Sequence, residues 1–225
     1  MKFNFKEFAK GILVICSYFL LQIILIMPFA FLLINNKISE NTIYLIVFVG
    51  MAITYIIAYR KSLLADLKDF KKNYKTILKK TIKYWLIGLG IMLLSSLIIG
   101  FLGISGSDNQ NTNIDLVKNA PIMQSFIVII LAPIIEELVF RRSFKNFTNN
   151  KILFAFVTGL IFGGMHVVTS ITSLKDLIML IHLIPYSSVG IALGLAYKEH
   201  NNIIGTMIAH GIHNTIAILE ILLLL

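Results

Sequence analysis

The chain of 225 residues contains a single cysteine, Cys16, and only four prolines. One cysteine excludes an intramolecular disulfide framework and a thiolate metal cluster. Charged residues make up only 14% of the sequence, whereas a soluble domain has about 25%. Hydrophobic residues make up 57%, against about 45–50% in a soluble domain. No polar stretch exceeds about 25 residues, roughly half of a small domain, so there is no room for a sizeable water-soluble domain. These shortages indicate an integral membrane protein.

Long apolar runs recur along the whole chain, and a membrane-spanning helix needs about 20 mostly apolar residues. We therefore predict an all-α, polytopic transmembrane bundle of about seven spans. The first run is too long for the core of a signal peptide and is interpreted as the first span. The expected spans are 11–34, 41–59, 82–104, 121–141, 152–170, 177–197 and 202–224.

Three features between and within these runs bear on the fold. The connector 60–83 carries nine basic and two acidic residues and is expected to be a surface helix on the anionic membrane face. The connector 105–120 is rich in turn-forming residues and is expected to be a loop. Pro185 is expected to kink the sixth span or to end a short helix just before it, so the segment 171–197 could be broken.

Basic residues are divided unevenly between alternate connectors. If the N-terminus is cytoplasmic, 17 of the 20 basic residues lie on the cytoplasmic side and three on the other. The positive-inside rule then favours seven spans with a cytoplasmic N-terminus. This topology explains the net charge of +9, so nucleic-acid binding is not expected. We predict a multi-pass protein of a bacterial plasma membrane, with the lipid bilayer as its surroundings.

Two adjacent carboxylates, Glu136 and Glu137, lie inside the fourth apolar run. A charged side chain at membrane depth costs at least ~2.5–3.5 kcal/mol, which makes such residues candidates for function. Neighbouring helical side chains project about 100° apart, so the two glutamates are not expected to share one task. Glu137 and Arg141 are spaced i,i+4 and are expected to pair. Glu136 is then free to point into the bundle as a candidate general base.

His166 follows Phe162 at i,i+4 spacing on the next apolar run. Gly163 and Gly164 lie between them and are small enough to let a neighbouring helix approach closely. A lone intramembrane histidine is as often a packing residue as a functional one. For His182, which stands alone, we favour the packing or helix-end interpretation.

His210 and Asn214 lie at i,i+4 spacing on the last run, so both polar groups face the same way. Two aligned polar groups in an apolar helix are difficult to explain by packing alone. With a rise of about 1.5 Å per residue, Glu136, His166 and His210 have depths compatible with one cavity near the middle of the bilayer.

These residue types suit hydrolysis by activated water. Glu136 could deprotonate the water, His166 could orient it or share the proton, and His210 and Asn214 could donate to the oxyanion. Alternatively, Glu136, His166 and His210 form a set of two histidines and one glutamate, which is typical of a catalytic zinc with an open position. The helical motif H-E-x-x-H is absent. Both mechanisms stay open, with zinc as a possible cofactor.

The motifs EExxxR at 136–141, FxxxH at 162–166 and HxxxN at 210–214 lie in this order on separate hydrophobic helices. They resemble the CAAX protease and bacteriocin-processing family, also called the Abi family, over about 120–220, and are similar to type 2 CAAX prenyl endopeptidases. The resemblance implies an intramembrane endopeptidase, of glutamate or metalloprotease type, that cleaves a membrane-associated protein or peptide. It implies a catalytic core at 120–225, which contains four of the expected spans; the other three expected spans form an N-terminal part at 1–119. Carried over by position, the base is Glu136, its partner is His166, the oxyanion stabilisers are His210 and Asn214, and the supporting residues are Glu137, Arg141 and Phe162.

Two other functions are compatible with these features. The first is a non-catalytic protein of the same family, which gives self-immunity to a bacteriocin or acts as a membrane scaffold. The second is a small proton-coupled transporter, because intramembrane glutamates and histidines also mark proton relays. The transporter is disfavoured because the sequence shows no inverted repeat.

Overall fold

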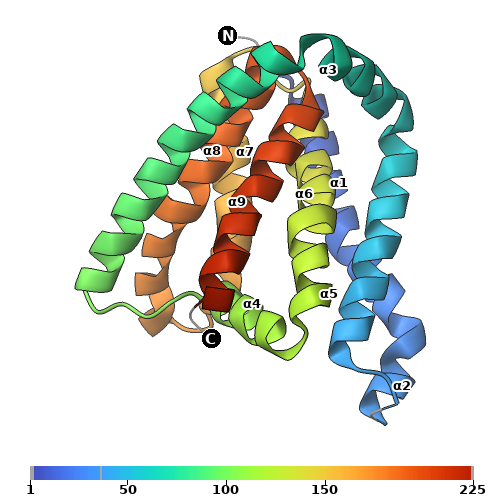
Figure 1. The fold of residues 1–225 in the computed structure, drawn as a ribbon, viewed down its shortest axis with the longest axis vertical. Helices are drawn as coiled ribbons and strands as arrows, with labels where there is room; N and C mark the ends of the chain where they lie inside the picture. Colours follow the sequence, from blue (N-terminus) through green and yellow to red (C-terminus); the bar gives the residue numbers. More distant parts are fainter. Residues whose placement is uncertain (1–2, 36, 224–225) are drawn as a thin grey trace.

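The computed structural model describes residues 3–35 and 37–223, and within these ranges the regular structure is helical. One isolated β-bridge joins Phe3 to Thr148. The all-α prediction is thus confirmed for the described residues (Figure 1). Two predicted features lie outside them, namely the basic residue Lys2 and residue 224, the last of the expected seventh span.

The helices follow one another with short connections. In chain order, the α-helices are α1 (Phe5–Ile26), α2 (Ala30–Ile34), α3 (Glu40–Phe101), α4 (Asp108–Asn119), α5 (Pro121–Phe126), α6 (Ala132–Glu137), α7 (Lys151–Val167), α8 (Leu183–His200) and α9 (Ile203–Leu223). Polar side chains begin several of them: Asn4 accepts a hydrogen bond from the Glu7 amide, and Ser39 accepts one from that of Thr42. Such caps satisfy amides at a helix start that have no partner within the helix.

The 62-residue helix α3 contains two of the predicted spans and the basic connector between them. In Figure 1 it runs along the bundle, bends at one end and returns on the other side. Six helices among the described residues are long and apolar enough to cross a membrane, and α3 is one of them. Because α3 covers 41–59 and all but the last three residues of 82–104, the six helices correspond to the seven predicted spans. The chain is a multi-pass membrane protein.

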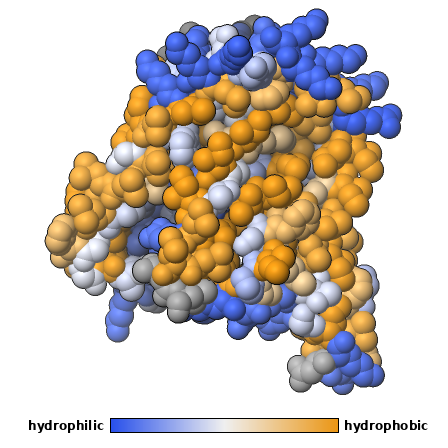
Figure 2. Space-filling model, viewed as in Figure 1, coloured by the Kyte–Doolittle hydropathy of each residue, from blue (hydrophilic) through white to orange (hydrophobic). Residues whose placement is uncertain are grey.

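Polar and apolar side chains are separated on the surface. Figure 2 shows hydrophilic side chains gathered at the end of the bundle where α3 bends, whereas the sides are largely hydrophobic. Large apolar residues on the outer faces are exposed, for example Leu13 on α1, Ile98 on α3 and Ile152 on α7. An apolar surface of this size would be unfavourable in water, but lipid tails can cover it.

The predicted fourth span, 121–141, is a helix interrupted by two π-helical segments. These are η2 (Ile127–Leu131), between α5 and α6, and η3 (Leu138–Arg142), directly after α6. Pro133 lies in the first turn of α6 and cannot donate an amide hydrogen, which is a common cause of such an irregularity. π segments change the direction in which the following side chains point and are frequent at functional sites.

Two predicted connections can be compared with the structure. The prediction of a loop at 105–120 is wrong, because α4 occupies most of it: Ser107 caps its first turn, Asp108 begins it and Lys118 lies in its last turn. Charges so placed favour a helix through its dipole, which outweighs the turn-forming composition. At Pro185, which was expected to kink the sixth span or end a short helix, a 3₁₀ segment, η5 (Leu174–His182), passes directly into α8 two residues before the proline, so the helix type changes there while the span stays continuous.

Helices α7 and α8 pack closely because glycines face the partner backbone. A Cβ atom at Gly163 would lie 2.8 Å from the Ser187 amide nitrogen, and one at Gly159 would lie 2.5 Å from that of Ile191. A Cβ atom at Gly164 would meet nothing within 4 Å. Of the two adjacent glycines expected to allow close approach, the structure assigns that role to Gly163.

These neighbours give a matched pair of substitutions. Gly163→Ala is expected to lower the free energy of unfolding in detergent by about 1–3 kcal/mol, the usual effect of overpacking. Gly164→Ala is expected to leave it unchanged or raise it by up to about 1 kcal/mol, because alanine favours a helix. Equal effects of the two substitutions in the same titration would contradict the packing described.

Candidate functional site

The centre of the candidate site is a fully buried ion pair on one helix. The Glu137 carboxylate lies 3.2 Å from the guanidinium of Arg141, and both side chains have no exposed surface. Arg141 also donates to the Gly190 carbonyl of α8 at 3.2 Å and lies over the Phe162 ring, 4.6 Å from its centroid. The expected i,i+4 pairing is confirmed. The pair is held in place from α7 and α8.

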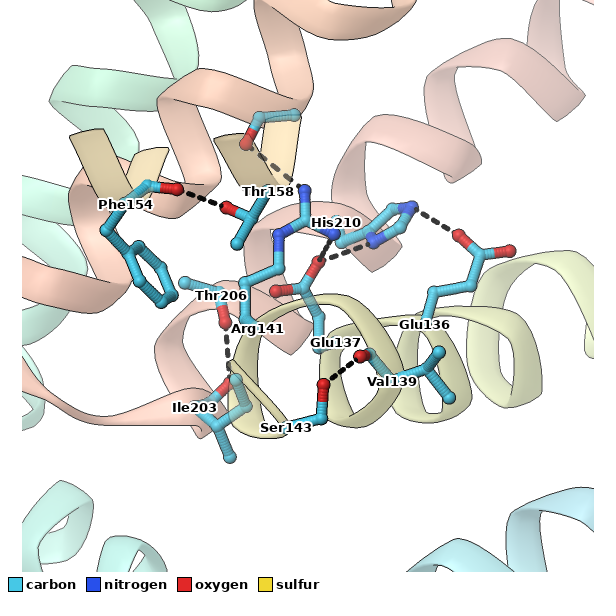
Figure 3. A network of polar contacts seen from close by, with 11 residues as sticks. Glu136, Glu137, Val139, Arg141, Ser143, Phe154, Thr158, Ile203, Thr206 and His210 are labelled. Atoms are coloured by element: carbon cyan, nitrogen blue, oxygen red, sulfur yellow. Dashed lines mark hydrogen bonds and ion pairs between the residues drawn. The ribbon is translucent and has the colours of Figure 1, made fainter. Parts of the chain in front are cut away.

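The imidazole of His210, from α9, lies between the two adjacent glutamates (Figure 3). Its Nδ1 is 3.0 Å from Oε1 of Glu137, and its Nε2 is 3.5 Å from Oε2 of Glu136. Both glutamates therefore face the same ring, although their side chains project about 100° apart on their own helix. The 100° argument considered one helix alone and could not include a side chain inserted from another.

Exposure distinguishes the two glutamates. The Glu137 side chain is fully buried, whereas 13% of the Glu136 side-chain surface is accessible. Only Glu137 has an adjacent guanidinium as its ion-pair partner. Of the two carboxylates, Glu136 is therefore the one that a water molecule or substrate can reach.

Phe162 connects the other predicted residues to this centre. Its ring centroid lies 4.6 Å from that of His166 and 5.7 Å from that of His210. The His166 ring also lies against Tyr186, with centroids 5.0 Å apart. The contacts shown for His166 are with aromatic rings, so the structure brings it to the cluster through Phe162 rather than through a bond to Glu136.

Asn214 lies one turn beyond His210 and faces the same helix. Its Nδ2 donates to the Val128 carbonyl at 2.7 Å, within the π segment η2. A Cβ atom at Gly211 would lie 3.0 Å from the Ile129 carbonyl, so the two helices are in close contact here. The shared direction of His210 and Asn214 is as predicted, and both side chains meet the helix that carries the glutamates.

Two further side chains lie at the start of α8: His182, the residue before the helix, and Tyr186, in its first turn. His182 is buried and its Nε2 lies 2.8 Å from the Ser105 carbonyl, which agrees with the packing role favoured for it. The Tyr186 hydroxyl is 2.9 Å from the hydroxyl of Ser107, at the start of α4. Sequence reasoning missed Tyr186, because one of eight tyrosines with no recognisable motif carries no signal.

The described residues contain no group of three or more His, Cys, Asp or Glu side chains arranged to hold a metal ion. Of the proposed ligands, Glu136 and His210 are close together, but His166 packs against rings. The set of two histidines and one glutamate therefore does not fit a zinc site here, and no step of the proposed reaction is assigned to zinc.

The fold and the cluster define a class of protein: a polytopic helical membrane protein in which two glutamates and a histidine meet inside the bundle, with an asparagine one helical turn away. Residues 118–216 match the family of type II CAAX prenyl endopeptidases described as Rce1-like. The matched segment contains all three motifs, which confirms the resemblance found in the sequence.

A protein of Lactococcus lactis resembles a larger part of the chain. The chain is 28% identical over 169 residues to the UPF0177 protein YxdF of Lactococcus lactis subsp. lactis (strain IL1403). This alignment covers 72% of the chain and 85% of the relative, so it extends well beyond the segment 118–216. No solved structure matches the chain significantly.

Proposed function

We propose that the protein is an intramembrane endopeptidase that hydrolyses a peptide bond of a membrane-associated protein or peptide with water activated by Glu136. One observation carries the proposal: the His210 imidazole contacts Glu136 on one side and the buried Glu137–Arg141 pair on the other. The family match supports it independently, because the matched proteins are described as endopeptidases.

The four side chains form a sequence of contacts in which each one orients the next. Arg141 balances the charge of Glu137, whose carboxylate accepts a hydrogen bond from Nδ1 of His210. The hydrogen bond at Nδ1 fixes the orientation of the imidazole and thereby determines which ring nitrogen faces the reacting groups. Nε2 is therefore directed at Glu136, the glutamate that remains partly accessible. Such an arrangement holds a base in position before the substrate arrives.

Peptide hydrolysis then needs one base and donors for the oxyanion. Glu136 takes a proton from water, and the hydroxide attacks the carbonyl carbon of the peptide bond. The same proton passes from Glu136 to the leaving amine as the C–N bond breaks, which gives a new carboxyl group and a new amino group. We assign His166 to orienting the water, and His210 and Asn214 to stabilising the oxyanion. Asn214 uses one amide hydrogen at the Val128 carbonyl, and an asparagine side chain has a second.

The surroundings of the site favour a substrate that carries an apolar anchor. The sides of the bundle are hydrophobic, and Figure 2 shows a hollow beside the lower part of α9 with hydrophilic atoms inside it. A peptide attached to a lipid chain could reach such a hollow from the bilayer. Because the family match is to CAAX prenyl endopeptidases, a prenylated CAAX peptide is the first substrate to test.

The test uses purified protein in liposomes and a fluorogenic farnesylated CAAX peptide. Wild-type protein is expected to release the C-terminal fragment, and both Glu136→Ala and His166→Ala are expected to lose this activity. Glu40→Ala, which removes an exposed glutamate at the start of α3, is the matched control and should cleave normally. Full proteolysis by both site variants would refute the proposal.

A further inference from the structure

A buried carboxylate lies where α3 bends, far in sequence from the motifs. Asp66 is only 8% exposed, although it belongs to the connector with nine basic residues. Its Oδ2 forms an ion pair with the Arg142 guanidinium and accepts a hydrogen bond from the Ile203 amide at 2.9 Å. Its backbone carbonyl accepts a hydrogen bond from the side chain of Asn202 at 2.8 Å. This carboxylate therefore faces the bundle rather than the basic surface.

The partners of Asp66 are the ends of the two helical segments that carry His210 and the two glutamates. Ile203 is the first residue of α9, and its amide has no partner within that helix. Asp66 thus caps α9 from another helix, with a negative charge at the positive end of the helix dipole. Arg142 is the last residue of η3 and directly follows Arg141. The segment η3 continues from α6, which carries Glu136 and Glu137. One carboxylate oxygen joins both helix ends.

A helix transmits a displacement of its end along its length. His210 lies seven residues after Ile203, a rise of about 10 Å, and Glu137 lies five residues before Arg142. If the link at Asp66 is lost, α9 can shift against the glutamates. A misplacement of about 1 Å in a catalytic arrangement can reduce a rate about 100-fold.

We propose that Asp66 is a positioning residue, which sets the position of His210 relative to Glu136 and Glu137 by joining the start of α9 to Arg142. The inference rests on the proposed function as far as activity is concerned, but the helix arrangement can be measured without it. Asp69 provides a matched control. It is an acidic residue on the same helix and accepts a hydrogen bond from Asn202, whereas its described contacts include neither Arg142 nor the Ile203 amide.

The structural test measures the distance between α9 and the helix of the glutamates by dipolar electron paramagnetic resonance. Spin labels replace two exposed residues, Ile130 of η2 and Ile216 of α9, in a Cys16→Ser background that removes the native exposed thiol. Asp66→Ala is expected to shift or broaden the distance distribution. Asp66→Asn keeps an oxygen for the helix amide but loses the charge, and should cause a smaller change. Asp69→Asn should match the parent.

The activity test uses the same Asp66 and Asp69 variants without labels. Asp66→Ala is expected to lower kcat about 10- to 100-fold with KM within about twofold, because substrate contacts are kept while the reacting groups are misplaced. Should the alanine variant fail to fold, Asp66→Asn is expected to show a smaller loss of kcat, and again no change in KM.

Two results would overturn the positioning role. One is an unchanged distance distribution in both Asp66 variants, and the other is an equal loss of kcat in Asp69→Asn. If the wild-type protein does not cleave any peptide, the proposed function fails, and the distance measurement alone still decides whether Asp66 positions α9.

Discussion

Glu136→Gln is expected to lower kcat for peptide hydrolysis about 10²- to 10⁴-fold, the range that a positioned general base supplies. Glutamine has the size of glutamate and can still contact Nε2 of His210, but it cannot take a proton from water. The Glu136 side chain is not paired with Arg141, so the melting temperature should stay within a few degrees of the wild type. Steady-state cleavage by protein in liposomes measures the rate, and thermal unfolding in detergent measures stability.

The matched control for this prediction is Glu220→Gln, which changes an exposed glutamate near the end of α9. It should cleave at the wild-type rate, since Glu220 lies outside the cluster. A Glu136→Gln protein that is folded and retains more than about half of the wild-type kcat would show that another group activates the water.

Arg141→Met is expected to have the largest effect on stability, a loss of about 3–5 kcal/mol in the free energy of unfolding. The substitution leaves the Glu137 carboxylate buried with no guanidinium beside it, in a site where both side chains have no exposed surface. It also removes the hydrogen bond to the Gly190 carbonyl and the contact with the Phe162 ring. Unfolding in mixed micelles by titration with a denaturing detergent measures the difference.

A second substitution separates the charge from the loss of packing. In the double variant Glu137→Gln with Arg141→Met no uncompensated carboxylate remains, so we expect it to recover about half of the lost stability or more. It should remain inactive, because the contact that orients His210 has changed. A single variant that loses less than about 1 kcal/mol, or a double variant less stable than the single one, would contradict this account of the pair.

The spans could be predicted because each apolar run is long enough to cross a bilayer by itself. The continuity of α3 was not predicted, although the sequence between residues 60 and 83 contains neither glycine nor proline, and so nothing there breaks a helix. The prediction of a loop at 105–120 was wrong because it considered composition without position. Its composition favours turns, but the Ser107 cap and the end charges favour a helix, and a residue count does not weigh their positions.

In the site, the contacts within one helix were predictable and those between helices were not. The i,i+4 spacing of Glu137 and Arg141 predicts their pair directly. His210 lies between two adjacent glutamates because α9 packs against a helix with π segments. Its contact with Glu137 joins residues that are 73 positions apart in the sequence. The contact of Asp66 with the Ile203 amide spans 137 residues and carries no sequence signal.

The most direct test of the central claim, that Glu136 activates water to cleave a peptide bond, is to follow the oxygen atom. Farnesylated peptide is incubated with wild-type protein in water enriched in oxygen-18, and the products are analysed by mass spectrometry. The account predicts one oxygen-18 atom in the new carboxyl group of the product, and labelled product formed about 10²- to 10⁴-fold more slowly with Glu136→Gln. Cleavage without oxygen-18 in that carboxyl group, or equal labelled product from the variant, would contradict it.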